Sequence, residues 1–170
     1  MALYIERAEN TARLVNTYNF LLLDLPRGTR VSWDILPVIT GGFEIFTEHY
    51  QRHDERNTVK FLLADTFNPA SLANSIASAR ENCRTSREVL PGQAWEQINE
   101  LQLYVRAHLD DALPRRGRFA FLTEVIQRCQ QLTGMLAGTM SHDNAYDFVR
   151  IGRNLERADM TTRVIDIGAM

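Results

Sequence analysis

Apolar residues recur every three or four positions along almost the whole chain, which is the period of an amphipathic helix. The pattern predicts a long first helix over residues 4–23, ending before Pro26 because proline interrupts a helix. Three shorter helices are expected in the segments 32–36, 43–53 and 59–64.

The rest of the chain has the same period between clear breaks. Asn68 and Pro69 give a cap followed by a proline, which predicts the start of a helix running to about residue 90. Two more helices are expected over 95–112 and 121–140, and Ser141 is the expected cap of the last one. No stretch alternates like a strand. The sequence therefore predicts one all-α domain over 1–170, a bundle of about six to eight helices.

A charged motif occurs twice in the chain. Residues 6–15 return as residues 156–165, with five of the ten positions identical. A repeat of this kind indicates internal duplication of a helical unit. We expect the first and last helices to lie side by side and to present related charged motifs.

The motif places charged residues in two different sectors of each helix. At about 100° per residue, Glu6, Glu9 and Arg13 share one side, and Glu9 precedes Arg13 in the favourable i to i+4 order. The second copy repeats that pair as Asp159 and Arg163. In contrast, Arg7 and its counterpart Arg157 fall within apolar sectors. An unpaired guanidinium there is costly, so each is predicted to meet a carboxylate or an anionic ligand.

A second set of charged residues follows the Asn68–Pro69 start. Arg80, Arg84 and Arg87 form one row beside a core stripe, with Glu81 further round the helix. Three interpretations are open: internal ion pairs with the acidic side chains of the repeat, an arginine cradle for a phosphate or carboxylate ligand, or simple surface salt bridges. In the first, the acceptors would be Glu6, Glu9, Glu156 and Asp159.

Composition narrows the class of protein. The net charge is −2, which argues against a protein that acts mainly on nucleic acid or an anionic membrane. Cys83 and Cys129 are too few for a disulfide framework and both fall on apolar helix faces, so they are expected in the core. With no signal-peptide pattern and no membrane-spanning apolar run, a cytoplasmic location is expected.

The sequence offers three functional hypotheses. It contains no nucleophile elbow, phosphate-binding loop or zinc-protease motif, which favours a non-catalytic partner or ligand-binding module without a cofactor. The alternative is an amide- or acyl-transfer enzyme with Glu6 or Glu156 as general base. Its anion-stabilising residues would be Arg80, Arg84 and Arg157. A weaker alternative is a metal site at His49 and His53, one helical turn apart. The run 115–118 is expected to be a solvated loop.

Three groups of residues carry a resemblance to a known family. They are 4–14, which begins Tyr-Ile-Glu-Arg-Ala-Glu, then 68–72 with 79–84 and 95–99, and finally 141–143 with 152–163. In these stretches, and in their order, the chain resembles the bacterial alpha-E domain family. The resemblance implies an all-helical protein found beside circularly permuted ATP-grasp proteins and transglutaminase-like proteases. It further implies a part in making or modifying small peptides, with no activity assigned to the domain itself.

The resemblance also bears on partners. Typical members are about twice as long, so the chain is expected to correspond to an incomplete domain. The expected partners are an ATP-grasp-type protein or the second half of the domain. Self-association is a further possibility, because a missing half leaves apolar helix faces uncovered.

Overall fold

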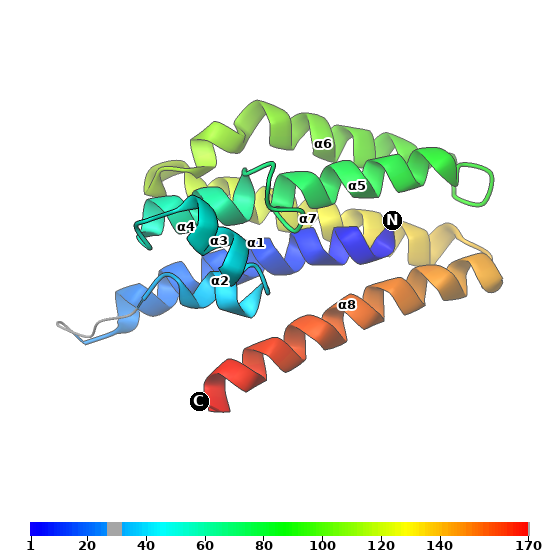
Figure 1. The fold of residues 1–170 in the computed structure, drawn as a ribbon. Coiled ribbons are helices and arrows are strands. Elements are labelled where there is room, and N and C mark those ends of the chain that lie inside the picture. The colour runs from blue at the N-terminus through cyan, green and yellow to red at the C-terminus, as the bar shows by residue number, and fades with distance from the viewer. Residues whose placement is uncertain (27–31, 170) are drawn as a thin grey trace.

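The computed structural model describes residues 1–26 and 32–169, and all regular structure in these residues is helical. Within them the prediction of an all-α bundle is confirmed (Figure 1). None of the described helices combines the length and the apolar character needed to cross a membrane. The eight helices are α1 (Ala2–Asp24), α2 (Ile35–Ile39), α3 (Phe43–His49), α4 (Glu55–Leu63), α5 (Leu72–Thr85), α6 (Gly92–Ala112), α7 (Arg115–Thr139) and α8 (Asn144–Ala169).

Helix α1 lies at the centre of the arrangement. It packs against α5, α7 and α8, while α6 covers the far side of α5 and α7. Figure 1 shows the short helices α2, α3 and α4 gathered at one end and α8 alone along the outer edge of the bundle. The helix at the centre and the helix at the edge are those that carry the repeated motif.

The core side of α1 is built from small and branched residues at helical spacing. Ile5 is 3% exposed, and Ala8, Ala12 and Val15 are fully buried. Alanines at two of these positions let neighbouring helices approach α1 closely, which burial of apolar surface then stabilises. This face of α1 is therefore covered by the bundle.

Two helix starts differ from the sequence prediction. Ser71, not Asn68, caps α5 by accepting a hydrogen bond from the Asn74 amide. Asn68 instead accepts from the amide of Ala70, forming a tight turn before the helix. Similarly, Asp143 rather than Ser141 accepts hydrogen bonds from the first free amides of α8. In both cases the cap is formed by a suitable side chain that lies closer to the first turn of the helix.

The prediction that residues 115–118 form a solvated loop is wrong. They form the first turn of α7, and the Arg118 side chain is only 2% exposed. Arg118 donates to Glu55 at 2.8 Å and to the carbonyl oxygen of Leu113 at 2.7 Å. Arg115 also donates to Glu55. These bonds tie the start of α7 to the start of α4.

Both cysteines lie in the core, as predicted. Cys83 is 1% exposed and Cys129 is fully buried. Burial raises the pKa of the Cys129 thiol, and the nearby carboxylates of Glu9 and Glu6 add to the shift. Cys129 is therefore an apolar core residue that lies close to the charged part of α1.

We predict that Glu55→Gln destabilises the fold in a pH-dependent way. Burial raises the pKa of Glu55, but hydrogen bonds from Arg115 and Arg118 outweigh it and hold the pKa below its ordinary value of 4.5. The ionised carboxylate therefore adds stability that is complete above about pH 4.5 and is lost as the pH falls through the folded-state pKa. The substitution should lower the free energy of unfolding by about 1–2 kcal/mol at pH 7 and by less at pH 3.

Urea unfolding at the two pH values measures both losses. Glu100→Gln, at an exposed position on α6, is the control and should have little effect at either pH. An equal loss for Glu55→Gln at pH 7 and pH 3 would contradict the prediction.

Candidate functional site

The two copies of the motif face each other across the contact between α1 and α8. The helices run side by side in the same direction (Figure 1). A Cβ atom built on Gly152 would lie 3.6 Å from the backbone nitrogen of Leu3, so α8 approaches α1 closely at this point. The side-chain pairs that follow join residues 147–151 positions apart. The expectation that the first and last helices are neighbours is confirmed, and the repeats lie in register.

The central contact is a reciprocal exchange of ion pairs. Arg7 of α1 donates two hydrogen bonds to Glu156 of α8, from Nε to Oε1 and from Nη2 to Oε2, both 2.7 Å long. In the opposite direction, Arg157 of α8 donates from Nε to Oε1 of Glu6 at 2.7 Å. Arg153, one turn earlier on α8, donates to the other oxygen of Glu6 at 3.1 Å.

Burial makes these pairs matter for stability. Glu6 is 2% exposed, and Glu156, at 5%, is the only buried residue among those of α8 that the structure describes. The hydrogen bond to Glu156 raises the pKa of Arg7, and the bond to Glu6 raises that of Arg157. The prediction that Arg7 and Arg157 each find a carboxylate is confirmed, but the buried members of the pairs are the glutamates, because the side chains of Arg7 and Arg157 are 28% and 50% exposed.

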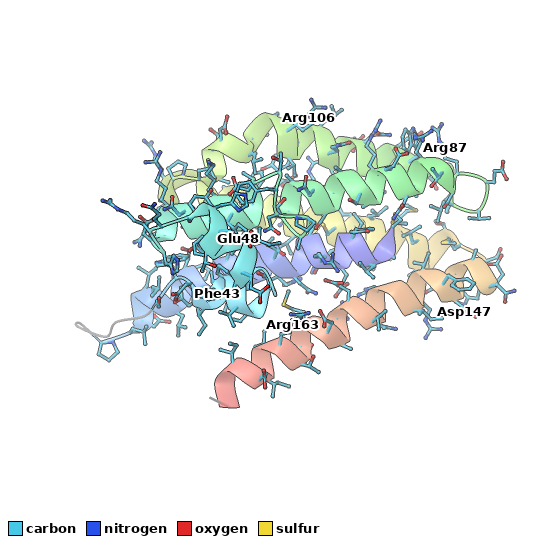
Figure 2. The ribbon with its side chains drawn as sticks, viewed as in Figure 1. Phe43, Glu48, Arg87, Arg106, Asp147 and Arg163 are labelled. Carbon is cyan, nitrogen blue, oxygen red and sulfur yellow. The ribbon has the colours of Figure 1, made fainter. Side chains whose placement is uncertain are left out.

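Each copy of the motif also contains its own local pair. Arg13 donates to Glu9 at 2.7 and 2.9 Å, and Arg163 donates to Asp159 at 2.9 Å, as the i to i+4 spacing predicted. Arg163, labelled in Figure 2, also packs on Gly41, where a Cβ would lie 2.5 Å from its Nη1. Gly41 has φ of +72°, a backbone conformation that favours glycine.

Arg80, Arg84 and Arg87 do not contact the acidic side chains of the repeat. The interpretation that they form ion pairs with those side chains is therefore wrong. Arg80 donates to Asn99 at 2.5 Å, and its guanidinium lies 4.9 Å from the ring centre of Trp95. Arg87, which follows the end of α5 and is labelled in Figure 2, lies 4.2 Å from the same ring centre. Arg84 pairs with Glu81 on the surface. Arg80 and Arg87 thus lie over Trp95 of α6, whereas Arg84 stays on the surface.

These placements break up the catalytic set of the enzyme hypothesis. Both oxygens of Glu6 and both of Glu156 already accept hydrogen bonds from arginine, and both residues are buried. A general base needs an oxygen within reach of the substrate proton. Arg80 and Arg84 bind other partners, so only Arg157 remains beside the proposed bases.

The two histidines have partners of their own. The ring of His49 stacks on Phe67 at 3.9 Å, and its Nδ1 lies 2.9 Å from the carbonyl oxygen of Ile45. His53 lies 3.3 Å from Asp34. Among the described residues no group of three or more metal-ligating side chains comes together, so nothing joins His49 and His53 in a site.

A polar groove opens beside the reciprocal pairs, between α1, α7 and α8. Its volume is about 590 Å³. The walls formed by α1 and α8 contain the charged residues of the two motif copies, whereas the α7 wall contains small or uncharged polar residues. The lining residues are Glu6, Glu9, Asn10, Arg13, Gln130, Thr133, Gly134, Ala137, Arg153 and Arg157.

Six residues of this surface were not predicted from the sequence, namely Asn10, Arg153 and the four residues of α7. Arg153 precedes Glu156 by three positions and shares its helix face, a spacing that could have indicated it. The α7 wall gave no comparable signal, because which side of α7 faces α1 depends on packing between distant segments.

Comparison with protein families matches residues 1–170 to Alpha-E, described as a predicted alpha-helical domain with a conserved ER motif. The chain therefore belongs to the Alpha-E family. The dipeptide Glu-Arg occurs at 6–7, 55–56 and 156–157, and all three glutamates accept hydrogen bonds from arginines. Searches of curated proteins and of solved structures found no match.

We predict that Arg7→Met lowers the free energy of unfolding by about 2 kcal/mol or more, because Glu156 would stay buried without its two hydrogen bonds. Arg116→Met, at an exposed position on α7, is the control and should change stability by no more than about 0.5 kcal/mol. Urea unfolding at pH 7 measures both.

The double variant Arg7→Met/Glu156→Met tests the pairing itself. Removing both charges should cost clearly less than the sum of the two single substitutions, since neither charge is then left alone. Additive losses, or equal losses at Arg7 and Arg116, would show that the reciprocal pair does not hold α8 in place.

Proposed function

We propose that this chain is a non-catalytic helical partner module, and that the outer face of α8 is the surface that binds its partner. We further propose that it acts in the bacterial cytoplasm, in an ATP-grasp-associated system that makes or modifies peptides. The observation that carries the docking proposal is the exposure of α8 residues whose counterparts in α1 are buried.

The repeat allows a position-by-position comparison of the two helices. Ile5 is 3% exposed and Val15 is fully buried, whereas their counterparts Leu155 and Ile165 are 62% and 64% exposed. The counterparts of the buried Ala8 and Ala12 are exposed as well. In α1 this face is covered by α5 and α7. The same face of α8 is suited to helices that would cover it in an equivalent way.

We call this face the α8 seam. Its residues follow spacings of three and four, as at the a and d positions of a coiled coil. All of them are exposed in the structure, and Phe148 is 75% exposed. Exposed apolar surface of this extent on one helix is typical of a protein–protein contact. The seam consists of Phe148, Ile151, Leu155, Ala158, Thr162 and Ile165.

The charges beside the seam indicate what kind of partner fits. Asp147, Asp159 and Asp166 occupy flanking positions, and no basic residue does. Figure 2 labels Asp147 near the start of α8. Because none of the flanking positions is basic, a second α8 helix, paired in either direction, would offer these aspartates no basic side chain across the contact. The seam therefore suits a partner with arginine or lysine beside its apolar helix face better than a second copy of this chain.

The family gives two sources for such a partner. One is an ATP-grasp-type protein, and the other is a second half of the domain carried on further polypeptide. Both can supply apolar helices of the kind that cover α1. The partner's identity rests on the family resemblance, whereas the place of contact rests on the exposed seam.

We predict that Leu155→Glu abolishes binding to the proposed ATP-grasp-type partner and leaves the fold intact. The new carboxylate would lie at the centre of the seam, yet Leu155 is already 62% exposed, so stability should change by about 0.5 kcal/mol or less. Titration calorimetry with the purified partner measures binding.

Leu103→Glu is the matched control, because Leu103 is 66% exposed on α6, away from α8. It should bind as the unaltered chain does. Binding that survives Leu155→Glu, or a stable dimer of this chain that the substitution dissociates, would contradict the proposed use of the seam.

A further inference from the structure

We infer that the groove between α1, α7 and α8 binds a small zwitterion, namely a free amino acid or a short peptide with both termini free. This inference concerns a different surface from the α8 seam and does not depend on it. It rests on hydrogen-bonding groups of the cluster that the ion pairs leave unused.

The α8 wall of the groove has guanidinium groups with donors to spare. Arg153 and Arg157 each use only Nε to hold Glu6, and their Nη atoms donate to none of the described residues. Their side chains are 35% and 50% exposed. Two neighbouring guanidinium groups with free N–H bonds are suited to a carboxylate, which accepts paired hydrogen bonds from such groups.

The α1 wall offers the complementary charge. Glu9 is 6% exposed, and its Oε1 accepts both hydrogen bonds from Arg13. Its Oε2 accepts none from the described residues, although Glu9 lines the groove. An ammonium group would satisfy this oxygen by a charge-assisted hydrogen bond.

The arrangement of charges, with free donors on α8 and a free acceptor on α1, favours a zwitterion over a simple anion. The groove contains three arginines and two glutamates, a formal charge of +1. A phosphate dianion would overcompensate that charge and would have to lie beside the Glu9 carboxylate. A ligand with one carboxylate and one ammonium group uses the free donors and the free acceptor together.

The α7 wall gives the ligand room. Thr133, Gly134 and Ala137 are small, and Gln130 offers an amide to a peptide backbone. A Cβ atom at Gly134 would meet nothing within 4 Å, so no protein atom fills the space beside it. The volume of about 590 Å³ lies within the range of small-molecule sites and suits more than a single small ion.

The test uses trialanine as the probe, followed by NMR chemical-shift changes of the arginine and backbone groups along the groove. N-acetyl-trialanine lacks the ammonium group, trialanine amide lacks the carboxylate, and inorganic phosphate replaces the zwitterion with an anion. Gly134→Leu fills the groove. Gly138→Leu is the matched control, because it is on the same helix, also has nothing within 4 Å of its Cβ, and does not line the groove. Leucine favours helix over glycine, so both variants should fold.

We expect trialanine to bind the unaltered chain and Gly138→Leu with the same affinity, and Gly134→Leu at least tenfold more weakly. Each blocked peptide should also bind at least tenfold more weakly than trialanine. Absence of trialanine binding at millimolar concentration, or binding that persists in Gly134→Leu, would overturn the assignment of the groove. If phosphate or N-acetyl-trialanine binds as tightly as trialanine, the proposal that the ligand is a zwitterion is wrong and the groove is an anion site.

Discussion

A carboxylate taken out of water needs a partner of opposite charge, and this requirement fixes the position of α8. Glu156 of α8 accepts hydrogen bonds from Arg7 of α1, and Glu6 of α1 accepts them from Arg153 and Arg157 of α8. Each helix thus supplies the charge that neutralises the other's buried acid. Apolar contacts alone would allow α8 to slide or rotate, whereas bidentate pairing at 2.7 Å specifies one register.

The exchange makes the α1–α8 contact nearly symmetric while the surroundings of the two helices differ. Helix α1 has α5 and α7 over its apolar face, and α8 has no helix of the described chain over the corresponding residues. Because the two helices carry the same apolar pattern, we would expect the corresponding face of α8 to be buried as that of α1 is. The exposed seam is therefore the surface to which we assign the proposed partner.

The same asymmetry accounts for the polar groove. Where α7 approaches the pair, small side chains on α7 leave space, and the arginines of α8 turn their unused donors toward it. If the groove binds the proposed ligand, structural and binding roles fall on different atoms of the same residues. The Nε atoms of Arg153 and Arg157 hold the helices together, and their Nη atoms stay available.

Most of the helices could be predicted from the sequence, because a helical period is a local property. The same was true of the need of Arg7 and Arg157 for a carboxylate or an anionic ligand, because an unpaired charge in an apolar sector is costly. The sequence also indicated that the first and last helices are neighbours. The partner of each arginine, the contact of Arg80 and Arg87 with Trp95, and the burial of Arg118 beside Glu55 could be seen only in the folded chain. These contacts depend on how helices far apart in the chain are placed, and the pattern within one helix contains no information about the distance to another.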